Sequence, residues 1–139
     1  MENKIVKGDV VVSFEIPLDP VTKKNGGQVV RRGKFSKVLP NKPYLKYEPL
    51  AIEKIPSSAK IGIDYPVNVK ALYYRKTKRR VDITNLESAL LDVLVKANVL
   101  VDDCAINTKG KEPIVVSTDG SRVYIDKDNP RTEVVITRQ

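Results

Sequence analysis

Runs of β-branched and aromatic residues, bounded by proline, glycine or charged positions, predict five β-strands. They cover residues 10–18, 67–74, 114–117, 122–125 and 131–138. Asp119-Gly120 stands between the third and the fourth run, and this dipeptide is favoured in tight hairpin turns. We therefore expect residues 114–117 and 122–125 to form an antiparallel hairpin.

The apolar positions of residues 85–97 follow helical spacing. Six side chains recur at intervals of three and four residues and make one core-facing stripe: Leu86, Ala89, Leu90, Val93, Leu94 and Ala97. Thr84 and Glu87 match a capping box, in which Thr84 is the N-cap and the Glu87 carboxylate bonds back to it. Leu91 and Val95 form a second apolar patch, which either a dimer contact or burial under the N-terminal segment would cover.

A shorter helix over 44–55, ending before Pro56, and an extended piece over 98–103 complete the pattern. Strands outnumber helices and do not alternate regularly with them, which favours an α+β fold over a doubly wound parallel sheet. With 139 residues, 41% of them hydrophobic and 30% charged, the chain has the size and composition of one globular domain. We expect a single domain over 1–139, in which a small mixed or antiparallel sheet packs against one principal core helix.

The basic residues indicate a polyanionic partner. Lys and Arg total 25 against 17 Asp and Glu, a formal charge of +8, and nucleic acid is the first candidate. Residues 21–46 form a long basic loop, with a ribbon around 28–30 as one option, and its plainer interpretation is a solvated hairpin with ordinary surface lysines. A second basic run follows the strand over 67–74. The candidate DNA contacts are Lys23, Lys24, Arg31, Arg32, Lys34, Arg75, Lys76, Lys78, Arg79 and Arg80.

Several missing features suggest where the protein acts. No apolar stretch approaches the ~20 residues that cross a bilayer. The N-terminal residues lack the apolar region and the cleavage site of a secretion signal, and a lone cysteine, Cys104, excludes an internal disulfide. We therefore expect a cytoplasmic protein without a membrane partner.

Histidine is absent, so any hydrolytic chemistry depends on carboxylates, lysines, hydroxyls or a hard cation. Asp82 precedes the predicted core helix, and Asp102 and Asp103 follow it. If the extended piece pairs beside the strand that leads to Arg80, these carboxylates approach one sheet edge, where they repel unless a cation lies between them. Mg²⁺ prefers such oxygen ligands. The alternative is that the aspartates belong to turns, with Asp82 paired to Arg79 or Arg80.

The segment VDITNLESALLDVLVKANVLVDD (81–103) resembles the core of the RusA-type Holliday-junction resolvases. In that family the motif D-x-D-N-L is followed by a helix that contains L/F-D-x-L, then by a short strand and D-D. The residues that fall at the family's spacing are Asp82, Asn85, Leu86, Asp92, Leu94, Asp102 and Asp103. Pro20 with Lys24-Asn25, the basic strand before Asp82 and the final strand NPRTEVVIT are similar too, so the resemblance covers most of the chain.

The resemblance implies a small homodimeric endodeoxyribonuclease of phage or bacterial origin that acts in DNA recombination and repair. Such enzymes bind four-way DNA junctions and nick opposing strands symmetrically with Mg²⁺ or Mn²⁺. Asp82 and Asp103 would be the metal-binding catalytic carboxylates, with Asp102 beside them, and Asn25 would join the DNA contacts. A twofold dimer suits a nearly twofold substrate, because each subunit can place one metal site at one strand.

Two positions depart from the family pattern. Its second carboxylate falls on Thr84, and the lysine often found in the first helical turn falls on Ser88. Either Thr84, Glu87 or Asp92 completes the metal ligands, or activity is reduced or lost; Asp92 also has a plainer role in an ion pair with Lys96. The alternatives to an enzyme are therefore a nucleic-acid-binding protein of the same fold without catalysis, and an interaction protein whose charge is incidental.

Overall fold

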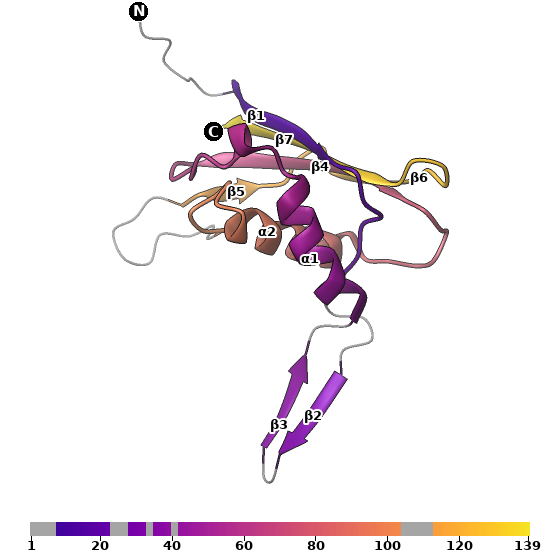
Figure 1. The fold of residues 1–139 in the computed structure, drawn as a ribbon. Helices are drawn as coiled ribbons and strands as arrows, with labels where there is room; N and C mark the ends of the chain where they lie inside the picture. The colour runs from indigo at the N-terminus through magenta and orange to yellow at the C-terminus, as the bar shows by residue number, and fades with distance from the viewer. Residues whose placement is uncertain (1–7, 23–27, 33–34, 40–41, 104–112) are drawn as a thin grey trace, which may run out of the picture.

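The structure is a computed structural model that describes residues 8–22, 28–32, 35–39, 42–103 and 113–139. In these residues the chain forms an α+β fold with a five-stranded mixed sheet, a separate two-stranded sheet and two α-helices (Figure 1). In chain order the elements are β1 (Val10–Ile16), β2 (Gln28–Arg32), β3 (Phe35–Leu39), α1 (Lys42–Lys54), the short 3₁₀ helix η1 (Ser57–Ala59), β4 (Val67–Arg75), α2 (Ile83–Lys96), β5 (Val115–Ser117), β6 (Arg122–Ile125) and β7 (Arg131–Arg138).

The main sheet has the order β1–β7–β4, with β5 and β6 both paired to the outer edge of β4. β7 lies between β1 and β4 and is antiparallel to both. Val69, Ala71 and Tyr73 of β4 are buried, and with Val134 and Ile136 of β7 they form the sheet side of the core. All five predicted strands are present, and β-branched or aromatic residues, which favour extended backbone, recur in each of them.

Figure 1 shows α1 and α2 on the same side of the main sheet. The predicted stripe of α2 is confirmed, since its apolar residues at helical spacing are buried in the core: Leu86, Ala89, Leu90, Val93 and Leu94. α1 contributes Tyr44, Tyr47 and Ala51 to the same core. In the described part of the chain, neither helix has the length and apolar content that crossing a bilayer requires.

The second apolar patch of α2 is covered within the chain itself. Leu91 and Val95 are partly buried and pack against the hydrophobic core. The Lys96 ammonium, which the sequence also allows to pair with Asp92, lies 2.8 Å from the carboxylate of Glu48 on α1 and joins the two helices. This patch therefore gives no reason for a dimer contact.

The predicted capping box is wrong. α2 begins one residue before Thr84, with Asp82 as the N-cap in an extended conformation. The Asp82 carbonyl accepts the first helical hydrogen bonds, while its side chain makes no capping bond within the described residues. Thr84 thus lies in the first turn, and Glu87 accepts a hydrogen bond from Thr118 beside the sheet, away from the helix start. The contact with the sheet outweighs the local capping preference.

The predicted hairpin at Asp119-Gly120 is also wrong, because β5 and β6 both run parallel to β4 along the same edge. The turn between them is held by Asn68 of β4. Its Oδ1 accepts hydrogen bonds from the Ser117 hydroxyl at 2.6 Å and the Asp119 N–H at 2.7 Å, and its Nδ2 donates to the Asp119 carbonyl at 3.1 Å. Gly120 adopts a φ of 87°, and a Cβ there would lie 2.8 Å from the Lys70 side chain. The turn therefore interrupts one edge strand and does not reverse the chain.

Residues 21–46, expected as a long basic loop, contain an antiparallel ribbon. β2 pairs with β3 from Gln28↔Leu39 to Arg32↔Phe35, which confirms the ribbon option around 28–30. Figure 1 shows this hairpin pointing away from the main sheet and the helices. Arg31 and Arg32 belong to β2, whereas the candidate DNA contacts Lys23, Lys24, Asn25 and Lys34 lie outside the described residues.

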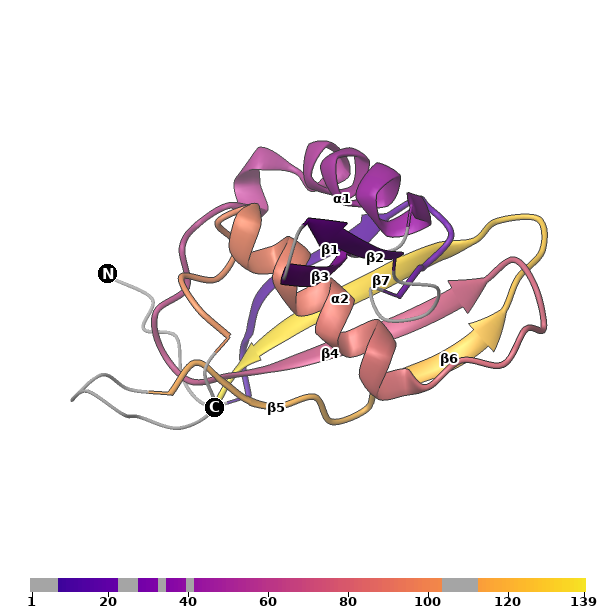
Figure 2. The same cartoon turned by 90° about the horizontal axis from the view of Figure 1, so that it is seen from below.

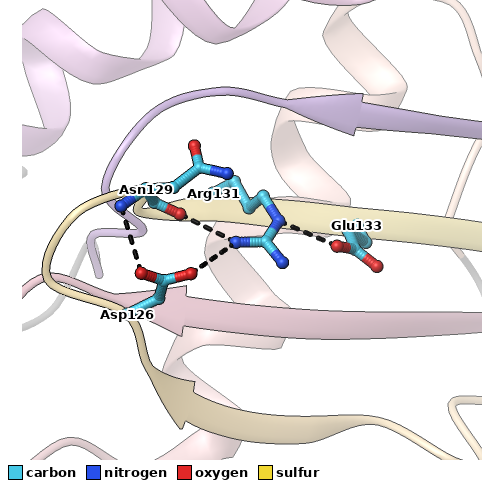
Figure 3. A network of polar contacts seen from close by, with 4 residues as sticks. All are labelled: Asp126, Asn129, Arg131 and Glu133. Carbon is cyan, nitrogen blue, oxygen red and sulfur yellow. Dashed lines mark hydrogen bonds and ion pairs between the residues drawn. The ribbon is translucent and has the colours of Figure 1, made fainter.

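The face of the sheet opposite the helices carries an aromatic and ionic layer. Tyr74 and its ladder partner Tyr124 stack with ring centroids 5.1 Å apart, and the Arg131 guanidinium lies 3.8 Å from the Tyr74 ring centroid. Arg131 also pairs with Asp126 at 2.9 Å and with Glu133 at 2.8 Å (Figure 3). The Arg131 hydrogen bond lowers the pKa of the Asp126 carboxyl. These contacts fasten the short strand β6 to β4 and β7.

Candidate functional site

The connection between β4 and α2 is an exposed basic loop. It carries Lys76, Lys78, Arg79 and Arg80 directly after Arg75, the last residue of β4. One Nη1–H of Arg75 donates to the Arg79 carbonyl, and the Lys76 N–H donates to the Asp19 carboxylate at 2.9 Å. The loop is thus tied to its own strand and to the segment after β1, so its cations are held at one end of the sheet.

A cavity of about 550 Å³ lies against this loop. Its lining residues come from the segment after β1, the start of α1 and the loop itself: Asp19, Pro20, Val21, Thr22, Pro43, Arg75, Thr77, Arg79, Arg80 and Val81. The Arg75 Nε is buried and has no hydrogen-bond partner among the described residues. Guanidinium groups gathered at one cavity favour anions between them: the Asp19 carboxylate is one such group in the lining, and phosphate oxygens match the same guanidinium fork.

Asp82 directly follows Val81, one of the cavity residues, and is exposed at the N-terminus of α2. The sequence therefore places one candidate metal ligand next to the candidate phosphate site. Arg79 and Asp82 therefore lie at the same end of the sheet.

Asp102 and Asp103 lie at the other end of β4. After α2 the chain turns at Asn98, which has a φ of 61°, and Leu100 forms a parallel bridge with Ile63. The Val101 N–H donates to the Ile63 carbonyl at 3.0 Å. Ile63 precedes β4, whereas Asp82 follows it, and the 14-residue helix α2 spans about 21 Å between the ends. The extended piece therefore pairs with Ile63 and not beside the strand end that leads to Arg80.

Asp103 belongs to a small acidic group. Its backbone N–H donates to the Asp102 carboxylate at 2.7 Å. Burial raises the pKa of the Asp103 carboxyl first, and a side-chain hydrogen bond with Asp102 and the charges of Asp102 and Asp92 raise it further. A nearby cation would relieve this repulsion. However, in the described part of the chain no three acidic or cysteine side chains come close enough to hold a metal ion.

Glu87 and Thr84, the candidate substitute ligands from the sequence, have different surroundings. Thr84 is exposed in the first turn of α2. Burial raises the pKa of the Glu87 carboxyl, and the hydrogen bond from Thr118 lowers it in part. Tyr73 lies close to Glu87. Burial raises the pKa of the Tyr73 phenol most, and the charge of Glu87 raises it further. Glu87 thus faces the connection between β5 and β6.

Residues 19–22 and Pro43, which line the cavity, are not among the candidate site residues predicted from the sequence. Asp19-Pro20 marks the end of a strand in the sequence, but nothing local indicates that it meets the basic loop some fifty-seven positions later. Comparison with known protein families finds no matching family, and no curated protein matches the chain.

Proposed function

We propose that the protein is a divalent-metal-dependent endonuclease that resolves four-way DNA junctions by paired nicks in recombination or repair, acting as a homodimer in the cytoplasm. The proposal rests on one observation: Asp82 directly follows the exposed basic loop, whose arginines line a cavity. The resemblance of residues 81–103 to the RusA-type resolvases supports the same function and the same acidic residues.

The residues divide into two roles. Arg75, Arg79 and Arg80 hold the DNA phosphates at the cavity, where their guanidinium forks match phosphate oxygens. Asp82 at the start of α2, and Asp103 with Asp102 beyond its far end, would hold Mg²⁺ or Mn²⁺, with Thr84 in the first turn of α2 and Glu87 beside Thr118 as the candidate further oxygen donors. A cation bound there would supply Lewis-acid stabilisation of the charge that develops on the phosphate during hydrolysis.

A nucleic-acid-binding protein of the same fold without catalysis is the second candidate. It is favoured by Thr84, which stands where the family pattern has a carboxylate, and by the lack of a three-carboxylate group within the described residues of one protomer. In that case the loop from Arg75 to Arg80 binds DNA, and the aspartates serve as a helix cap and a turn.

A cleavage assay tests the two candidates. We expect the full chain to cut four-way DNA in the presence of Mg²⁺ or Mn²⁺, to lose this activity in EDTA, and to leave a linear duplex of the same sequence uncut. A flap substrate measures the preference among branched structures. If no branched DNA is cut with either metal while binding persists, the endonuclease is refuted and the binding protein remains.

The basic loop is expected to contribute a sequence-independent part of DNA affinity. Arg79→Gln should weaken junction binding and reduce the slope of log affinity against log salt concentration by about one, because one phosphate contact is lost. Lys54→Gln removes the same charge from an exposed position at the end of α1 and should leave the slope unchanged. Binding titrations at several salt concentrations measure both, and equal slopes for the two variants contradict a contact at the cavity.

A further inference from the structure

β5 and β6 form a free edge of the main sheet. Both strands run parallel to β4, and no strand of the described ranges pairs with their other side. All four residues of β6 are exposed, and apolar side chains along the edge expose between 37% and 52% of their surface: Val116, Val123, Tyr124 and Ile125. Such an edge, with unpaired backbone groups, is a template for a further strand.

The two ends of this edge carry opposite charge. Where β6 finishes, the Asp126 N–H donates to the Arg75 carbonyl, next to the exposed basic loop of residues 76–80. Where β5 begins, the Val67 N–H donates to the Ile114 carbonyl. Ile63, which precedes β4 in the chain, accepts a hydrogen bond from the Val101 N–H, and the exposed Asp102 and Asp103 directly follow Val101. Among the described residues, the edge is therefore basic at one end and acidic at the other.

A second copy of the chain complements such an edge. In a twofold dimer the two edges run antiparallel, so β5 of each copy lies opposite β6 of the other, and each basic end meets an acidic end. The twofold axis is then perpendicular to the sheet, and the helices of both copies lie on the same face of one continuous sheet. Figure 2 views the molecule from this helix side and shows the diagonal course of α2 across the strands.

Asp82 lies near this edge. Glu87, five residues further along α2, accepts a hydrogen bond from Thr118 in the connection between β5 and β6. The N-terminal part of α2 is therefore next to the middle of the edge. Within one protomer Asp103 lies beyond the opposite end of β4, so each carboxylate lacks the other as a partner for a shared cation.

We propose that two copies pair through the β5–β6 edge and that each metal site combines Asp82 of one subunit with Asp103 of the partner subunit. This inference rests on the proposed endonuclease function. The edge pairing brings the acidic end of one copy to the basic loop and the helix start of the other. A protomer alone then holds half of two sites, and the dimer completes both.

Two inactive variants test the shared site. Asp82→Asn and Asp103→Asn subunits carry different affinity tags, and the mixed dimer is purified over both tags and verified by native mass spectrometry. One of its two shared sites keeps both aspartates, so we expect it to nick one strand of a four-way junction at about half the wild-type rate. Each parent dimer should be inactive. A mixed dimer that stays inactive, while wild type cuts, overturns the inference.

The reciprocal mixed dimer gives the opposite readout. A wild-type subunit paired with an Asp82→Asn/Asp103→Asn double variant leaves one aspartate missing from every shared site, so we expect no nicking. If each site lay within one subunit, the wild-type subunit would keep a complete site and nick the junction. Nicking by this dimer therefore overturns the inference, whereas a wild type that cuts no branched DNA refutes the endonuclease function itself.

The edge can be tested without any cleavage. Ile125→Asp places a charge on β6 and should give a monomer in sedimentation experiments, with its circular dichroism unchanged. Val10→Asp changes an equally exposed valine on β1, at the opposite edge of the sheet, and should remain dimeric. A monomeric wild type, or an Ile125→Asp variant that stays dimeric, overturns the proposed interface whether or not the protein cuts DNA.

Discussion

Asp82→Asn is expected to slow the metal-dependent cleavage of four-way DNA by about 100-fold or more, because it removes a charged metal ligand. Asparagine has nearly the same size and is an equally favoured N-cap, so the free energy of unfolding should change by less than about 0.5 kcal/mol. Removal of a negative charge beside Arg79 and Arg80 should leave junction binding intact or tighter. Single-turnover cleavage and binding titrations measure the two effects separately.

Asp128→Asn is the matched control for this prediction. Asp128 is exposed in the turn between β6 and β7, outside the proposed site, and the change removes the same charge. We expect wild-type cleavage from this variant. Wild-type cleavage by Asp82→Asn, or an equal loss in Asp128→Asn, contradicts the role of Asp82 as a metal ligand.

Asn68→Ala is expected to lower the free energy of unfolding by about 2–3 kcal/mol. Asn68 is only 7% exposed, and its amide makes three hydrogen bonds to Ser117 and to the backbone of Asp119. Alanine leaves these groups without partners and opens a space beside β4. Urea denaturation measures the loss, and hydrogen exchange at residues 117–121 should rise well above that of β7.

The amide of Asn129 provides the comparison for Asn68. Asn129 is exposed, and its backbone carbonyl accepts the Arg131 hydrogen bond while its backbone N–H donates to Asp126 (Figure 3). Asn129→Ala keeps these backbone contacts and should change the free energy of unfolding by less than about 0.5 kcal/mol. Similar losses in the two variants would mean that Asn68 does not hold the edge strand.

The secondary structure could largely be predicted because the signals are local. The apolar stripe of α2 repeats at helical spacing, and the predicted limits 85–97 differ by two residues or fewer from Ile83–Lys96. The strand over 131–138 was predicted with the limits that β7 has in the structure. In both segments the spacing of the apolar side chains that face the core indicates whether the segment is a helix or a strand.

The pairing of the edge strands could not be predicted in the same way. Asp119-Gly120 indicates a turn, and a turn is present, but its direction depends on Asn68, 51 residues earlier in the chain. Hydrogen bonds from the Asn68 amide hold this turn, where a hairpin would have hydrogen bonds between its two strands. A pattern limited to residues 114–125 cannot contain this information.

The candidate site, too, could be predicted only in part. The basic run and the aspartates at both ends of α2 are visible in the sequence, since they depend only on residue types beside predicted elements. The position of Asp103 depends on the bridge between Leu100 and Ile63, which joins segments 37 positions apart. The cavity likewise needs Pro43 and residues 19–22, which carry no local sign of binding.

The β2–β3 ribbon pairs only with itself in the described chain, while the core is built from the other strands and the helices. The ladder of the ribbon is therefore separate from the ladder of the main sheet. A ribbon of another length would leave the order β1–β7–β4 unaltered, so we expect versions of such a chain to differ in residues 28–39 while the main sheet is kept.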